Sequence, residues 1–114
     1  MATMKKNARG WFQHGDVTIK PIAAIPKDAK PSTRRVLAYG EVTGHSHRLL
    51  DTADVEVFER EGADGTLYIR VGPKGAPVGH EEHGVGVIDE VGAFEIGRVQ
   101  EWDHFAEEAR RVQD

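Results

Sequence analysis

Short runs in which hydrophobic and polar residues alternate recur along the chain. Val55 and Val57 alternate with polar residues in DVEVFER, and Leu67, Ile69 and Val71 share one face of TLYIRV. A period of two residues is that of a β-strand with one buried face. Because EGADG, which is rich in turn residues, separates the two runs, the pattern predicts a β-hairpin.

The rest of the chain continues this pattern of short strands and turns. Further strands are predicted at 17–22, around 36–39, at 85–88 and at 93–99. The proline-containing and glycine-containing segments IPKDAKPST (25–33) and GPKGAPVG (72–79) are predicted to be loops. Asp103 is a suitable N-cap, and the charges that follow it match the dipole of a short helix that ends the chain.

These elements predict an all-β fold. Several short strands, with turn signals every ten residues or so, are typical of a small sandwich or barrel. We expect a single β domain over residues 11–114, closed by the short C-terminal helix, and a flexible N-terminal tail over residues 1–10.

Composition narrows the choice of partners. The 114 residues carry a net charge of -4, which argues against nucleic acid as the principal partner. No apolar run is long enough to span a membrane and the N-terminus lacks an export signal, so we expect a soluble cytoplasmic protein. A domain this small has a limited core, and a homo-oligomer is therefore expected.

Histidine carries the main chemical signal. Four of the six histidines fall in two glycine-led clusters, GHSH and GHEEH, and the chain has no cysteine. His45 and His47 are two residues apart, which places both rings on one face of a strand. His80 and His83 are three apart and share a face only in a turn, a helical turn or a bulge.

Carboxylates accompany both clusters. In an extended strand, Glu81 or Glu82 would replace one imidazole of the second cluster as the residue that shares a face with the other. Glu41 lies four residues before His45, on the same face of an unbroken strand, and is a candidate supporting group or general base.

We therefore predict a divalent-metal site at His45, His47, His80 and His83, supported by Glu41, Glu81 or Glu82. Imidazole and carboxylate ligands suit Zn, Mn, Fe, Ni or Cu. An open coordination position would allow the ion to polarise a water for chemistry on a small molecule. His14 and His104 stand beside aromatic residues, and packing or surface roles are expected for them.

Two resemblances accompany these residues. The HxH of GHSHRLL, with a following hairpin, a GPKGAP turn and another histidine, resembles a reduced cupin motif. Cupins are small jelly-roll β-barrels that commonly bind a metal. The run LAYGEVTGHSHRL, with HEEHG and QEWDHF after it, resembles short uncharacterised bacterial and phage-borne proteins, a resemblance that implies no activity.

The rival hypothesis is a non-enzymatic structural or protein-interaction module, for which the second resemblance implies a phage origin. Exposed sheet edges and the terminal aromatic residues would then mediate self-association. The histidines would occupy loops or hydrogen-bond to the backbone.

Overall fold

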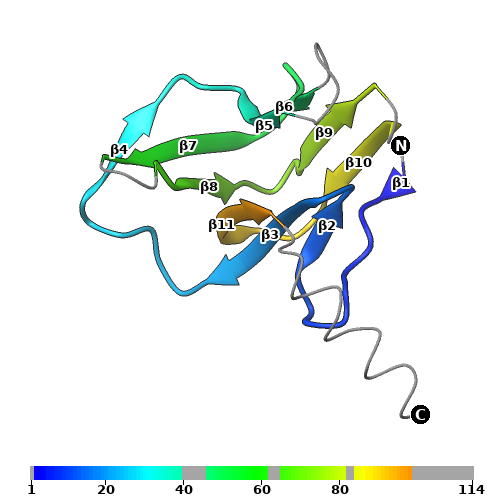
Figure 1. Cartoon of the computed structure of the whole chain (residues 1–114), viewed down its shortest axis with the longest axis horizontal. Helices are drawn as coiled ribbons and strands as arrows, with labels where there is room; N and C mark the ends of the chain where they lie inside the picture. Colours follow the sequence, from blue (N-terminus) through cyan, green and yellow to red (C-terminus); the bar gives the residue numbers. More distant parts are fainter. Residues whose placement is uncertain (1, 40–45, 62–64, 82–83, 99–114) are drawn as a thin grey trace.

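The computed structural model describes residues 2–39, 46–61, 65–81 and 84–98, and this part of the chain consists of β-strands in two sheets (Figure 1). Those ranges contain no helix, and so no candidate membrane-spanning helix. The strands are β1 (Ala2–Thr3), β2 (Phe12–His14), β3 (Val17–Ile22), β4 (Ala29–Ser32), β5 (Val36–Tyr39), β6 (Ser46–Leu49), β7 (Val55–Arg60), β8 (Leu67–Val71), β9 (Ala76–His80), β10 (Gly84–Ile88) and β11 (Gly92–Arg98).

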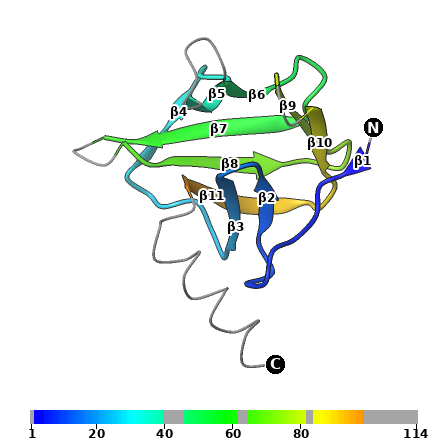
Figure 2. The same cartoon turned by 45° about the vertical axis from the view of Figure 1, so that its right-hand side comes forward.

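The two sheets are separate in their backbone hydrogen bonding. One has the order β2-β3-β11-β8-β7-β4 and the other β1-β10-β9-β6-β5. Neighbouring strands are antiparallel, apart from the parallel pair of β1 and β10. Figure 2 shows β5, β6, β9 and β10 along one side of the six-stranded sheet. The all-β prediction is confirmed, in the form of two sheets around one core.

The predicted hairpin is present as β7 and β8, where Val57 lies opposite Ile69. Both side chains are buried, as the alternation requires. The core also contains Phe12 and Phe94, whose ring centroids are 6.0 Å apart in an edge-to-face arrangement. One hydrophobic cluster takes residues from both sheets, and the burial of this cluster holds the sheets together.

The strands predicted at 17–22, 36–39, 85–88 and 93–99 are confirmed by β3, β5, β10 and β11.

Two segments predicted as loops contain strands instead. Within 25–33, β4 pairs with β7 at the edge of its sheet, where Pro31 can be tolerated because only one side of the strand needs hydrogen bonds. Within 72–79, β9 lies between β10 and β6. Pro77 lacks an N–H, but its carbonyl accepts a hydrogen bond from the Leu50 N–H at 3.0 Å. The proline and glycine content gave the wrong prediction because it does not show which side of a strand is paired.

The flexibility predicted for residues 1–10 stays a prediction, but residues 2–10 have defined positions in the fold. β1 pairs with β10, and the Met4 N–H donates to the Val87 carbonyl at 2.9 Å. The Met4 side chain belongs to the core. The predicted C-terminal helix lies outside the described residues.

Replacement of Phe94 by alanine should destabilise the domain by about 3–5 kcal/mol, because it leaves a cavity beside Phe12 in the middle of the core. Urea unfolding followed by circular dichroism measures the change. Val91, which is 63% exposed, offers the control: Val91→Ala should change the free energy of unfolding by less than about 0.5 kcal/mol. Equal effects of the two substitutions would contradict the assignment of the core.

Candidate functional site

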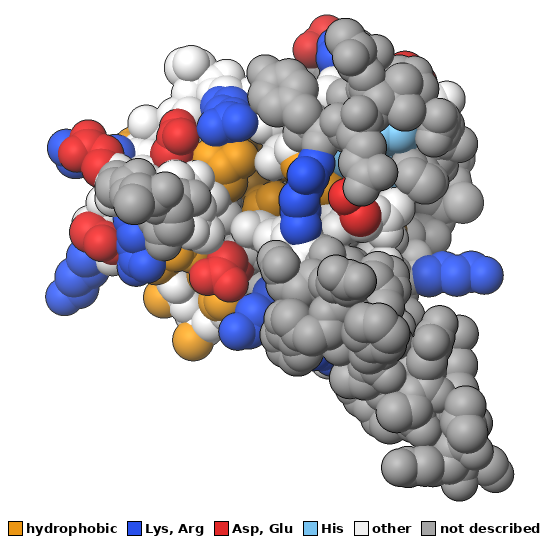
Figure 3. All heavy atoms as spheres, viewed as in Figure 1, with side chains coloured by type: hydrophobic (Ala, Val, Ile, Leu, Met, Phe, Trp, Pro, Cys, Tyr) orange, Lys and Arg blue, Asp and Glu red, His pale blue; other side chains and the backbone are white. Residues whose placement is uncertain are grey.

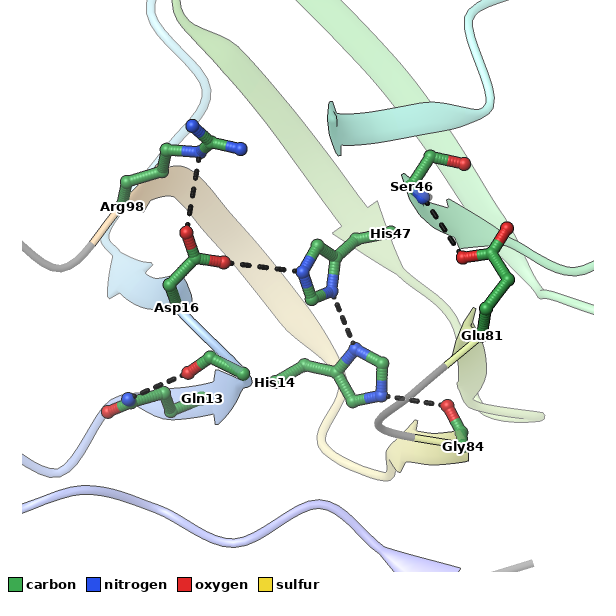
Figure 4. A network of polar contacts seen from close by, with 9 residues as sticks. Gln13, His14, Asp16, Ser46, His47, Glu81, Gly84 and Arg98 are labelled. Carbon is green, nitrogen blue, oxygen red and sulfur yellow. Dashed lines mark hydrogen bonds and ion pairs between the residues drawn. The ribbon is translucent and has the colours of Figure 1, made fainter. Parts of the chain in front are cut away.

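Two buried histidines from different sheets meet at one end of the fold. His14 ends β2 at the edge of the six-stranded sheet, and His47 lies in β6 of the other sheet. Their side chains point toward each other (Figure 4), and the two Nδ1 atoms are 2.9 Å apart. The residues are 5% and 1% exposed. Water therefore has little access to the contact.

The outer nitrogen of each ring faces an oxygen that accepts hydrogen bonds. His14 Nε2 lies 3.0 Å from the Gly84 carbonyl oxygen, and His47 Nε2 lies 3.3 Å from Oδ1 of Asp16. A carbonyl or carboxylate oxygen accepts hydrogen bonds, so the tautomer with the proton on Nε2 fits both contacts. In neutral rings of this tautomer, both Nδ1 atoms hold lone pairs, and these lone pairs face each other.

Facing lone pairs at this distance repel each other unless something positive lies between them. An added proton satisfies the geometry, because an imidazolium Nδ1–H donates to the Nδ1 of the other ring. A metal ion bound to both Nδ1 atoms also satisfies it. His14 and His47 are thus the described residues whose Nδ1 atoms could hold one small cation.

Asp16 connects this pair to a second cation. It lies in the turn between β2 and β3, and its side chain is 40% exposed. Its Oδ2 is 3.9 Å from Arg98 Nε, at the end of β11. The carboxylate therefore lies between an imidazole and a guanidinium.

His80 contacts the pair through its ring. Its ring lies 4.3 Å from that of His47, centroid to centroid, with a tilt of 32°. Continuing the pairing of Arg48 with Gly79 by one residue places His47 opposite His80 on neighbouring strands. The ring centroids of His80 and His14 are 6.5 Å apart. The half-buried His80 ring thus covers one face of His47.

Glu81 joins the same two strands beside the histidines. Its Oε2 accepts a hydrogen bond from the Ser46 N–H at 3.0 Å. The Ser46 hydroxyl in turn accepts from Arg48, with Nη2 at 2.8 Å. These contacts fix the start of β6, immediately before His47.

The structure brings together part of the predicted metal site. His47 and His80 lie side by side, and Glu81 contacts the backbone of the residue before His47. His45, His83, Glu41 and Glu82 lie outside the described residues. In the ranges that are described, no group of three or more His, Asp or Glu side chains is arranged to hold a metal ion. What these ranges do contain is the pair of facing Nδ1 atoms of His14 and His47.

Sequence reasoning missed His14 and Asp16. The packing expected for His14 describes its burial but not its contact with His47. A signal was present, because Phe12 and His14 are two residues apart and both are buried on one face of β2. Nothing in the local sequence shows that this face meets β6, because His47 lies 33 positions after His14 in the chain.

The comparisons with known proteins give a family without an activity. The model of a family described as a domain of unknown function, DUF8820, matches residues 13–98. That range contains His14, Asp16, His47, His80 and Arg98. Searches of curated proteins and of solved structures each found no match.

Gly86 in β10 offers a test of how tightly the pair is held. A Cβ at this position would lie 3.3 Å from Cδ2 of His14 and 3.2 Å from Cε of Met4. His14 is fixed at both ring nitrogens and cannot move without losing a contact. Gly86→Ala should therefore destabilise the domain by about 1–3 kcal/mol and shift the His14 ring resonances in NMR spectra.

The matched control is Gly79→Ala in the neighbouring strand β9. There the Cβ would lie 3.2 Å from a methyl group of Leu50, which can rotate away. This variant should leave the His14 resonances in place. A shift of His14 that is equal in both variants would contradict the tight packing of its ring.

Proposed function

The chain belongs to the DUF8820 family, and from the geometry of its histidines we propose that it is a metal-binding domain whose site is centred on His14 and His47. The two Nδ1 atoms are the ligands in this proposal. The observation that carries it is that both Nε2 atoms face acceptors, which leaves both Nδ1 lone pairs directed at one position between the rings.

The surroundings of the rings favour a metal ion as the occupant. Histidines that bind metals usually donate the other ring N–H to a carboxylate or a backbone carbonyl, which fixes the tautomer and makes the ligand more basic. Asp16 plays this part for His47, and the Gly84 carbonyl plays it for His14. Each ring of the pair therefore has the kind of acceptor at Nε2 that is usual for a metal-binding histidine.

The spacing requires only a small adjustment. Two nitrogens bound at about 2.0–2.1 Å to a tetrahedral zinc ion lie about 3.3 Å from each other. The Nδ1 atoms are now 2.9 Å apart, and an increase of about 0.4 Å in this distance would make room for the ion. The rings would also turn so that their lone pairs converge on the ion, at some cost to the contacts that hold them.

The ligand types fit the ions expected from the sequence, namely Zn, Mn, Fe, Ni or Cu. Two nitrogens do not complete a coordination sphere, so water or further side chains would occupy the other positions. His80 is the nearest described imidazole, and His45 and His83 stay predicted ligands from the sequence. Self-association and a cytoplasmic location also stay predictions.

The proposal predicts near-stoichiometric uptake of one divalent ion by untagged, chelator-treated protein. Calorimetric titration with each of the five ions measures this uptake. His14→Gln and His47→Gln should each abolish it, because each removes one of the two facing nitrogens. Asp16→Asn should weaken it by about 10–100-fold, since it replaces the charged acceptor that orients His47. Acidification should weaken it as well, because protons compete for the same lone pairs.

His104→Gln is the control, since His104 belongs to neither the predicted nor the proposed metal site. It should bind the ion as the unchanged chain does. Long-range proton–nitrogen NMR provides a second measurement: His14 and His47 should both carry the proton on Nε2, with and without metal. Absence of uptake from all five ions would refute the proposal, and an Nδ1–H tautomer in both rings would refute its geometric basis.

A further inference from the structure

A separate pocket opens between the two sheets beside the histidine pair. It has a volume of about 340 Å³ and lies between β5 and the strands β8 and β11. Its apolar floor is formed by Leu37, Leu67 and Ile96, which are between 5% and 8% exposed and belong to the core. The volume falls within the usual range for small-molecule sites, about 300–1,000 Å³.

Two arginines from different strands or loops line this pocket. Arg34 precedes β5 and Arg98 ends β11. Their side chains are 39% and 44% exposed, so both guanidinium groups can be reached from solvent. In the space-filling view, hydrophobic surface is visible in the middle of one face, with basic and acidic side chains near it (Figure 3). The pocket thus combines an apolar floor with cationic groups.

Each of these arginines has a carboxylate near its guanidinium group. Arg34 Nη1 is 3.4 Å from Oε1 of Glu59, and Arg98 Nε is 3.9 Å from Oδ2 of Asp16. The Nε of Arg34 also donates to the Val36 carbonyl at 3.1 Å. Close charged hydrogen bonds of this kind measure about 2.7–2.9 Å, and exposed pairs that are longer contribute little to stability. An incoming anion can therefore compete with these two carboxylates, since the planar donors of a guanidinium group match a carboxylate or a phosphate.

We propose that this pocket binds a small organic anion. The apolar part of the ligand lies on Leu37, Leu67 and Ile96, and its carboxylate or phosphate group contacts Arg34 and Arg98. The pocket itself does not require a metal. The pocket is connected to the histidines through Arg98, Asp16 and His47. That connection rests on the proposed function, and the organic anion is then the class of ligand that would bind next to the metal.

The test is a titration of the full-length, nitrogen-15-labelled chain with benzoate and with phenyl phosphate, followed by amide NMR shifts. Chelator-treated protein is used first. Benzoate, phenyl phosphate or both should cause saturable shifts centred on Leu37, Leu67 and Ile96. The neutral benzamide, which has nearly the shape of benzoate, should bind at least about fivefold more weakly, since it lacks the charge that the arginines recognise.

Variants separate this pocket from other arginine-containing surfaces. Arg34→Gln and Arg98→Gln should each weaken binding of the anions about threefold to tenfold. Arg70→Gln is the matched control, because Arg70 is a similarly exposed arginine that lines a different hollow. It should leave the affinity unchanged. No saturable shifts, equal binding of benzamide, or a loss of binding in Arg70→Gln alone would overturn the proposal.

Repeating the titration on protein loaded with the metal separates the two proposals. Binding of the anion with an altered affinity after loading supports the link through Asp16. If no metal is taken up but benzoate binds at the pocket, the anion site stands and the metal site fails. If metal binds through His14 and His47 but neither anion binds, the reverse holds.

Discussion

The contact between His14 and His47 sets the properties of one end of this fold. Elsewhere the sheets are held together by apolar side chains, which impose no requirement on charge or hydrogen bonding. At this end two nearly inaccessible imidazoles meet, and buried polar groups must have partners. Asp16 and the Gly84 carbonyl satisfy the outer nitrogens, and so the chemistry of the end depends on what lies between the inner ones.

This arrangement ties the charge of the site to the positions of several strands. His14 comes from β2, His47 from β6, and the Gly84 carbonyl from the start of β10. A change of occupant between the rings would therefore act on strands of both sheets. Gly86 restricts the response, since the His14 ring lies close to the place that a larger side chain would fill. The site is therefore stiff on the side of β10.

The sequence predicted the strands well wherever local alternation decides the structure. Val57 and Ile69 were assigned to the two alternating strands of a hairpin, because that assignment depends only on a period of two residues and a turn. Prediction failed at Pro31 and Pro77, since pairing with distant strands determines whether a proline can be tolerated. The histidine site depends still more on distant contacts: the clustering of His45 and His47 was visible in the sequence, whereas the approach of His14 was not.

Charge balance connects the histidine pair to the neighbouring pocket. A single proton between the rings gives one positive charge, which the Asp16 carboxylate can balance. A divalent ion gives two positive charges, and Arg98 already shares the same carboxylate. Because an uncompensated charge in a buried place is costly, metal binding calls for a further negative group. An organic anion that engages Arg98 would relieve Asp16 of that second partner, leaving its charge for the histidine and the metal. The two proposed sites would then strengthen each other's binding, and linkage requires the effect to be equal in both directions.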